Sequence, residues 1–438
     1  MQESAKSSEF FGLTSYQWLV LFAAWLGWGF DVFDALLLNY VARLCIPALL
    51  GPGYDSPQII TWWTGILTSV LLIGWALGGI LFGRLTDSIG RSKALLITML
   101  LYGLATAASA FSVNIWMLMA CRFVAALGIG GEWAAGASLV AETIPEKRRV
   151  HAGAILYTAA PAGLFLATFV TDFFTRQLDF IAQDPNLSWR AVFLTGLVPA
   201  FVAILIRLKV KEPEMWKPQT SPPRIAELFS PELKRTTWCA MAVASIALVT
   251  WWSCNSFIPT IASFLAAEVG AAPANLAALK AEFVTTATMW FNLGGLLGCL
   301  MTVPVALYFG RRSMFLWYFL ASSLAIWFSF GADVQPETRL ISVFFIGLTV
   351  FGVFGSFTFY MPELFPTRLR ATGSGFCYNV GRFVTAVGPF LVGAVAKNAS
   401  SAAEILSIIS WVAVVPLLGV LLVLTGCVEE TKGRGLRA

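Results

Sequence analysis

Five charged side chains interrupt segments of this chain that are otherwise almost wholly apolar. A charge near the centre of a lipid bilayer costs at least ~2.5–3.5 kcal/mol, so each of these side chains is a candidate functional residue. A carboxylate at such depth can bind and release a proton, and a guanidinium can hold an anion. The five residues are Asp31, Asp34, Arg122, Glu132 and Arg382.

The composition is that of a protein that crosses a membrane many times. Of the 438 residues, 58% are hydrophobic and 12% are charged, and the mean hydropathy is +0.76. A soluble domain is about 25% charged. A helix needs about 20 apolar residues to cross a bilayer, and the sequence predicts twelve such spans. They cover residues 16–42, 61–82, 94–112, 115–140, 151–174, 189–208, 237–265, 283–308, 313–331, 338–361, 372–396 and 404–427.

Positive charge is distributed unevenly over the segments between these spans. Most of the 29 Lys and Arg residues fall in segments that share one side with both chain ends. Lys and Arg are enriched on the cytoplasmic side of membrane proteins, so both termini are predicted to be cytoplasmic. The pattern therefore predicts an all-α, multi-pass protein of the cell membrane.

The chain also divides into two similar parts. Residues 209–236 form a polar stretch with five prolines, which predicts a cytoplasmic linker between six spans in residues 1–208 and six in residues 237–438. Two motifs recur in both parts, Glu142-x-x-Pro145-x-x-x-Arg149 as Glu363-x-x-Pro366-x-x-x-Arg370 and Asp87-x-x-Gly90-Arg91 as Leu307-x-x-Gly310-Arg311. Such a repeat predicts two six-helix bundles with a substrate site between them.

The first candidate site combines the acids of span one with Arg122 in span four. Asp31 and Asp34 are three residues apart and share one helical face. Counting ~1.5 Å per residue puts Asp31 and Arg122 at similar depth, with Asp34 one turn above. An acid beside an arginine that can move away gains and loses its proton readily, as a proton carrier must. The alternative is a permanent ion pair between spans one and four, and the spacing does not rank the two acids.

Arg382 in span eleven is the second candidate. Asn379 and Tyr378 precede it by three and four residues, so the three side chains can form one polar patch. The interiors of the spans of the second part contain no acid, and an unpaired buried arginine is costly, so Arg382 requires an anion. Its planar guanidinium suits a carboxylate. The predicted role is to anchor an anionic substrate, and the alternative is pairing with an acid of the first part.

Weaker candidates lie in spans four, five, seven and eight. Glu132 is predicted to be an inner gate or second proton station, or else a hydrogen-bonding group between helices. Small residues around it, such as Gly128 and Gly136, permit close helix packing. Other side chains predicted to line a cavity, or to form contacts between helices, are Asn255, Ser256, Asn292, Tyr157 and Trp133.

Enzyme chemistry is not predicted. The seven cysteines are scattered without paired spacing, which is typical of small buried side chains rather than of disulfides or a metal site. The polar parts contain no nucleophile with a base and no phosphate-binding glycine loop. They also contain no basic domain that could bind nucleic acid. No cofactor is expected.

Residues 83–93 read Gly-Arg-Leu-Thr-Asp-Ser-Ile-Gly-Arg-Ser-Lys and are predicted to form a tight charged loop. Their spacing resembles the loop between helices two and three of the major facilitator superfamily. The resemblance implies that Asp87 faces the N-terminus of helix eleven, near Thr372, where an anion is stabilised. Asp87 is then expected to latch the two halves while the site faces outward; the alternative is that the loop only orients the chain. The residues expected to form this latch are Gly83, Arg84, Asp87, Gly90, Arg91, Glu142, Arg149, Glu363 and Arg370.

Three further patches resemble particular branches of this superfamily. Residues 31–34 are similar to helix one of aromatic-acid:proton symporters and of sialate and lactate permeases, and residues 130–145 and 379–382 resemble organic-acid:proton symporters. The resemblance implies a functional monomer that takes up an organic-acid anion with protons by alternating access, driven by the proton gradient. Alternatives are a sugar or polyol:proton symporter, an exporter and a transport-inactive sensor. The glutamines and asparagines that sugar porters carry in helices seven and eight are sparse here, which favours the acid.

Overall fold

The computed structural model describes residues 11–54, 57–217, 223–269, 276–386 and 402–436. Every regular element in these residues is a helix, and ten helical segments are long and apolar enough to cross a membrane. The first helix group comprises α1 (Ser15–Leu50), α2 (Pro57–Ile89), α3 (Arg91–Ser109), α4 (Ile115–Thr143), α5 (Glu146–Tyr157), α6 (Ala159–Asp172), α7 (Asp179–Ala182), α8 (Pro185–Leu194) and α9 (Leu197–Lys209). The second helix group comprises α10 (Lys234–Glu268), α11 (Leu276–Ile326), α12 (Pro336–Leu364), α13 (Arg370–Thr385), α15 (Ala402–Ser410) and α16 (Val414–Leu424). Short 3₁₀ or π turns cover Phe173–Gln177, Ile225–Phe229, Trp327–Gly331, Thr367–Leu369 and Trp411–Ala413.

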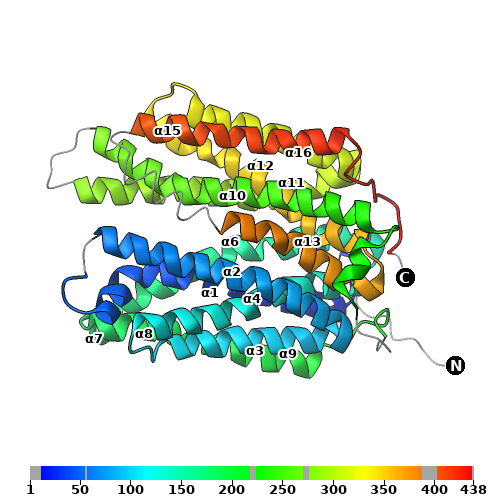
Figure 1. Cartoon of the computed structure of the whole chain (residues 1–438), viewed down its shortest axis with the longest axis horizontal. Coiled ribbons are helices and arrows are strands. Elements are labelled where there is room, and N and C mark those ends of the chain that lie inside the picture. Colours follow the sequence, from blue (N-terminus) through cyan, green and yellow to red (C-terminus); the bar gives the residue numbers. More distant parts are fainter. Residues whose placement is uncertain (1–10, 55–56, 218–222, 270–275, 387–401, 437–438) are drawn as a thin grey trace.

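The two helix groups lie side by side, with their helices along the long axis of the molecule (Figure 1). They meet where α2 packs against α13 and where α5 packs against α11 and α12. Gly12 lies beside Arg148, and Gly435 lies near Glu146, so the two ends of the described chain are at the same end of the bundle. We call this the terminal end.

The prediction of a loop over residues 83–93 is wrong. α2 continues as a helix through Arg84 and Asp87 to Ile89, and α3 begins at Arg91. Only Gly90 leaves helical geometry, with a φ of 110° that glycine adopts without a steric penalty. The chain can therefore reverse within one residue, and the polar side chains before it extend from a helix. Glu212 accepts hydrogen bonds from the backbone N–H groups of residues 91, 92 and 93, which caps α3.

The same arrangement recurs in the second helix group. The predicted spans 283–308 and 313–331 lie in one helical element, α11 with its π turn, that is kinked at Gly310, whose φ is 82°. Glu430 accepts hydrogen bonds from the backbone N–H groups of Arg311 and Arg312. The predicted span 372–396 is described only as far as residue 386, and its remainder lies outside the described residues. These two places account for the difference between twelve predicted spans and ten long apolar segments.

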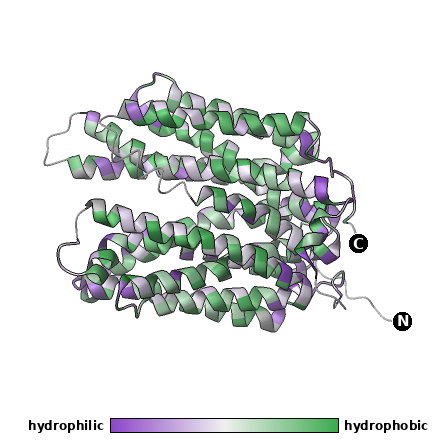
Figure 2. Cartoon of the chain, viewed as in Figure 1, coloured by the Kyte–Doolittle hydropathy of each residue, from purple (hydrophilic) through white to green (hydrophobic). Residues whose placement is uncertain are grey.

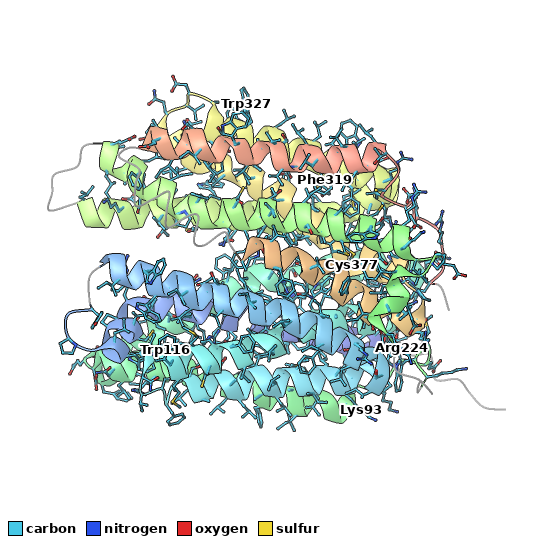
Figure 3. All side chains as sticks on the ribbon, in the orientation of Figure 1. Lys93, Trp116, Arg224, Phe319, Trp327 and Cys377 are labelled. Carbon is cyan, nitrogen blue, oxygen red and sulfur yellow. The ribbon has the colours of Figure 1, made fainter. Side chains whose placement is uncertain are left out.

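Apolar side chains cover the outside of the helices as well as their contacts. Figure 2 shows hydrophobic residues along most of the helix lengths, with hydrophilic residues gathered near the helix ends. Figure 3 shows Lys93 and Arg224 at the terminal end. Trp116 and Trp327 lie on the outer surface, where they are 65% and 58% exposed. Large exposed apolar side chains along helices of this length are what a protein presents to lipid.

Two glycines allow α2 and α13 to approach closely. A Cβ atom on Gly79 would lie 1.9 Å from Nδ2 of Asn379, and one on Gly83 would lie 2.8 Å from the carbonyl oxygen of Ala371. A spacing of four residues puts both glycines on one face of α2. Any larger residue would force the two helices apart.

Candidate functional site

Asp34 and Arg122 form a buried ion pair inside the first helix group. Arg122 Nη1 lies 2.6 Å from Asp34 Oδ1, and Arg122 Nη2 donates to the Asp34 carbonyl oxygen at 2.8 Å. Thr106 on α3 donates its hydroxyl to Asp34 Oδ2 at 2.5 Å and accepts from Arg122 Nη1 at 2.9 Å. Both carboxylate oxygens of Asp34 therefore have partners, and its charge is neutralised.

Counting residues along the helices put Arg122 level with Asp31, whereas the structure pairs Arg122 with Asp34. An arginine side chain is long enough to reach one helical turn, so equal depth of two backbone positions does not decide the partner. Thr106 comes from a third helix and adds hydrogen bonds at Asp34 alone. Asp31 has no cation within 4.0 Å among the described residues.

Asp31 and Glu132 form a second acidic pair, with surroundings unlike those of Asp34. Both side chains are buried, and their carboxyl groups interact with each other. Asp31 Oδ1 and both carboxyl oxygens of Glu132 lack a hydrogen-bond partner within the described part of the chain. A Cβ atom on Gly27 would lie 2.1 Å from Glu132 Oε1, so the Glu132 carboxyl occupies the space that this glycine leaves on α1.

Tyr102 on α3 lies within electrostatic range of these acids. Its side chain is fully buried, and its hydroxyl has no hydrogen-bond partner in the described residues. It interacts with Asp31, Glu132 and Asp34. The sequence alone does not single out Tyr102, because a tyrosine in an apolar span carries no pattern that sets it apart from a packing residue.

Arg382 on α13 faces the first helix group. Its Nη1 donates to Asn379 Oδ1 at 2.6 Å, and Asn379 Nδ2 donates to the carbonyl oxygen of Gly375 at 2.8 Å. The guanidinium carbon lies 4.0 Å from the centre of the Trp75 ring and 4.8 Å from that of Tyr378. Its Nε has no partner, and no carboxylate lies within 4.0 Å of it among the described residues. Asp31 acts on Arg382 only at longer range.

Aromatic rings from both helix groups meet beside Arg382. Trp133 stacks on Tyr378 with 4.4 Å between ring centres, and Trp28 lies 5.8 Å from Trp133 and 5.2 Å from Tyr157. On the other side, Tyr157 lies 6.0 Å from Phe354 of α12. We call these five rings the aromatic layer.

The indole N–H groups of Trp28 and Trp133 in this layer, and that of the neighbouring Trp251 on α10, are buried without a partner in the described part of the chain. Trp251 lies 6.3 Å from Phe354. Trp28 and Trp251 were missed from sequence, since aromatic residues make up 14% of the chain and no single ring stands out.

The two asparagines predicted to line a cavity make no hydrogen bond to Arg382 in the described part of the chain. They are Asn255 on α10 and Asn292 on α11, and both are partly buried. The side chain of Ser256 lies outside the described residues.

Asp87 joins the two helix groups at the terminal end. Its carboxylate accepts hydrogen bonds from the Thr372 backbone N–H and the Thr372 hydroxyl, both at 2.7 Å, and from the Ala371 N–H at 3.3 Å. Arg91 Nη1 lies 3.0 Å from the same carboxylate. The acid therefore sits at the N-terminus of α13, where backbone N–H groups stabilise a negative charge.

Two similar Arg–Glu–Arg clusters flank this contact. In each, a glutamate is paired with an arginine of its own helix group and an arginine of the other. Glu142 lies 2.8 Å from Arg91 and 2.7 Å from Arg370. Glu363 lies 3.0 Å from Arg311 and 3.7 Å from Arg149. In addition, Arg84 Nε donates to the carbonyl oxygen of Pro223 at 2.7 Å. The repeated motifs thus face each other across the contact between the groups.

Comparison with known proteins identifies the family. The family model of the Major Facilitator Superfamily matches residues 33–389, and the chain belongs to this superfamily. A putative metabolite transport protein of Haemophilus influenzae is 28% identical over 97% of this chain and 99% of its own length. The probable 4-methylmuconolactone transporter of Cupriavidus pinatubonensis is 28% identical over 83% of this chain and 80% of its own length. The sialic acid transporter NanX of Escherichia coli is 26% identical over 82% and 83%.

The fold is also similar to that of a solved structure. The structure of the proton:xylose symporter XylE matches with a TM-score of 0.77, covering 96% of this chain and 98% of that one, at 16% sequence identity. The protein is therefore a transporter rather than an enzyme, and it is a multi-pass protein of the cell membrane. The predicted resemblance to the superfamily and to its metabolite and sialate branches is confirmed.

Proposed function

We propose that this protein is a symporter that imports an organic-acid anion together with protons. The observation that carries the proposal is Arg382, which is buried and has no carboxylate partner among the described residues. An unpaired guanidinium inside a membrane protein requires an anion, and an anionic substrate supplies one. Sialic acid, which names the Escherichia coli relative, is a carboxylic acid. Arg382 is then the anchor for the substrate carboxylate, held in position by Asn379.

In this proposal the chain has twelve spans in two halves, residues 1–208 and 237–438, connected by the linker 209–236. The terminal end is cytoplasmic, as the enrichment of Lys and Arg in its segments supports. The two halves rock around a site at their interface and expose it to each side in turn. The monomer is the transporting unit.

The proton binds to the pair formed by Asp31 and Glu132. Two buried carboxyl groups that interact with each other cannot both carry a charge without a large penalty, so the pair binds a proton while it is closed off from water. Asp34 is not assigned the proton, because Arg122 and Thr106 occupy both of its carboxylate oxygens. Asp34 and Arg122 are therefore the permanent ion pair between α1 and α4.

Proton and substrate are coupled through Arg382. Asp31 is an acid of the first half whose charge acts on this arginine. When the pair loses its proton, the charge on Asp31 attracts Arg382 and competes with the substrate anion. When the pair is protonated, Arg382 is free to bind the carboxylate. The loaded site thus contains one proton and one anion, and their combined charge is zero for a monocarboxylate.

The aromatic layer favours an acid with a flat or apolar body over a polyol. Trp133 and Tyr378 offer stacked ring faces, and Trp28 and Trp251 add buried N–H donors. A sugar would need several side chains that bind hydroxyl groups, and Asn255 and Asn292 are not hydrogen-bonded near Arg382 among the described residues.

The contacts at the terminal end act as the latch of the outward-facing state. Asp87 at the start of α13, together with the clusters around Glu142 and Glu363, connects the halves on the cytoplasmic side. These contacts must separate before the substrate leaves. Gly83 permits the close approach, and Gly90 the reversal, on which the latch depends.

The test is proton movement in liposomes that contain the purified protein and an internal pH-sensitive dye. Benzoate, nicotinate, lactate, sialic acid and xylose are added outside, one at a time. We expect internal acidification with at least one acid, beyond the passive entry measured in liposomes with Arg382→Ala protein. Acidification with xylose alone, or with no compound despite measurable substrate binding, would reject proton-coupled acid uptake.

A further inference from the structure

We propose that the indole N–H of Trp75 is a second donor to the substrate carboxylate, so that the anion is held from both halves at once. Arg382 contributes from α13, and Trp75 contributes from α2. The inference rests on the proposed function, because it assigns a further residue to the same anion site.

The two side chains are in contact and buried, and each has a donor without a partner among the described residues. The Arg382 guanidinium carbon lies 4.0 Å from the centre of the Trp75 ring, and the side chains are 4% and 9% exposed. Arg382 Nε and Trp75 Nε1 each lack a hydrogen-bond partner among the described residues. Buried donors are almost always satisfied, so two adjacent ones without partners indicate that their acceptor arrives with a ligand.

A carboxylate matches this pair of donors in charge and in number of acceptors. One of its oxygens can accept from Arg382 Nε, and the other from the N–H at the edge of the Trp75 ring. The cation–π contact holds the guanidinium over the face of the Trp75 ring, next to the N–H at its edge, before the substrate binds. A carboxamide lacks the negative charge and replaces one acceptor with a donor, which faces another donor in this site. The geometry therefore selects the ionised acid.

The position of Trp75 also connects the anion site to the latch. Trp75 and Asp87 are on the same helix, about 18 Å apart at ~1.5 Å per residue, and Arg382 and Thr372 are about 15 Å apart on α13. The two helices that bind the carboxylate are thus the two that Asp87 joins at the terminal end. A carboxylate that bridges Trp75 and Arg382 holds together the same two helices that Asp87 joins. Binding of the substrate and closure of the latch are therefore linked.

The test compares Trp75→Phe with wild type. Phenylalanine keeps an aromatic face for Arg382 and removes only the N–H. Trp63→Phe is the matched control, since Trp63 is on the same helix but packs against Trp116. Binding of benzoate, nicotinate, benzamide and nicotinamide is measured by calorimetry on purified protein, and melting temperatures verify that each variant is folded.

We expect Trp75→Phe to weaken binding of the acid about tenfold, equivalent to about 1.4 kcal/mol, and to change binding of its carboxamide less than about twofold. Trp63→Phe should leave both unchanged. Wild-type affinity for the acid in Trp75→Phe, or an equal loss for acid and carboxamide, would overturn the role of the N–H while leaving the proposed function intact. If the wild type binds none of the acids, and Arg382→Ala changes nothing, the proposed function fails and this inference fails with it.

Discussion

Asp34 and Asp31 lie one turn apart on α1, and their carboxyl groups have opposite surroundings. Asp34 is bonded to Arg122 and Thr106 through both oxygens. Asp31 faces a second acid, Glu132, and one of its oxygens has no partner among the described residues. Depth and residue type alone therefore do not separate the two acids. In the proposed mechanism the proton goes to the acid whose polar atoms lack partners, because a group that already has all its partners gains little from a proton.

The largest effect is expected when the ion pair between Asp34 and Arg122 is broken. Arg122→Ala leaves the Asp34 carboxylate buried without a cation, which costs ~3–5 kcal/mol and should lower the melting temperature by at least about 5 °C. Asp31→Asn removes a charge from a crowded pair and should leave the melting temperature near that of the wild type. The double variant Asp34→Asn/Arg122→Ala should recover part of the loss. Equal destabilisation by Arg122→Ala and Asp31→Asn would remove the distinction between the two acids.

A second prediction displaces Glu132 from Asp31 without removing either acid. In Gly27→Ala the new methyl group would lie 2.1 Å from Glu132 Oε1, so the carboxyl must move. We expect acid-driven proton uptake to fall roughly 10- to 100-fold, because a displacement of about 1 Å at a reacting group has this effect. Gly29→Ala is the control, since its methyl group would lie 3.5 Å from the nearest atom, an ordinary contact. Equal rates of proton uptake in the two variants would argue against the acidic pair as the proton site.

The third prediction concerns the latch. Asp87→Asn keeps the size of the side chain and weakens its bonds to the N-terminus of α13, so the halves should engage less firmly. Transport in liposomes should slow about three- to tenfold, with substrate affinity changed less than twofold. Ser88→Ala, at a half-buried neighbour whose hydroxyl bonds within α2, is the control. A loss of affinity without a loss of rate would contradict the role of Asp87.

The smallest expected effect concerns the ion pair between Glu227 and Arg368, which lies outside the membrane, and it depends on pH. The hydrogen bond from Arg368 holds the pKa of Glu227 below its ordinary value. The ion pair therefore stabilises the folded state above the unfolded pKa of ~4.3, and this stabilisation is lost as the pH falls through the lower, folded pKa. Both side chains are about one-third exposed, so the gain is below ~1 kcal/mol. Glu227→Gln should lower the melting temperature slightly at about pH 7, and the difference should shrink as the pH falls below ~4.3.

Sequence patterns were sufficient for the parts of the site that depend on spacing along one helix. Helical periodicity puts Asn379 one turn from Arg382, and the repeated motifs indicate the clusters around Glu142 and Glu363. The family resemblance put Asp87 opposite Thr372. The contacts are present, and the transport roles assigned to them remain predictions.

Contacts between different helices could not be predicted from such sequence patterns. The partner of Arg122 depends on Thr106 from a third helix, and three-residue spacing leaves both acids of α1 on one face. Trp75 and Tyr102 have no distinguishing pattern in a chain rich in aromatic residues. They stand out through polar atoms that have no partner among the described residues, which only the packed structure reveals. The loop prediction at 83–93 failed because a single glycine with positive φ replaces a longer turn.

The most direct test of the account separates proton coupling from substrate binding. Proton uptake driven by the transported acid, and exchange of labelled acid across the membrane without a gradient, are measured in liposomes for Asp31→Asn, Glu132→Gln and wild type. The account predicts that both variants lose the acid-driven proton uptake and keep the exchange, because Arg382 still binds the anion. Full proton coupling in both variants would contradict it, most clearly if a folded Asp34→Asn/Arg122→Ala protein lost coupling instead.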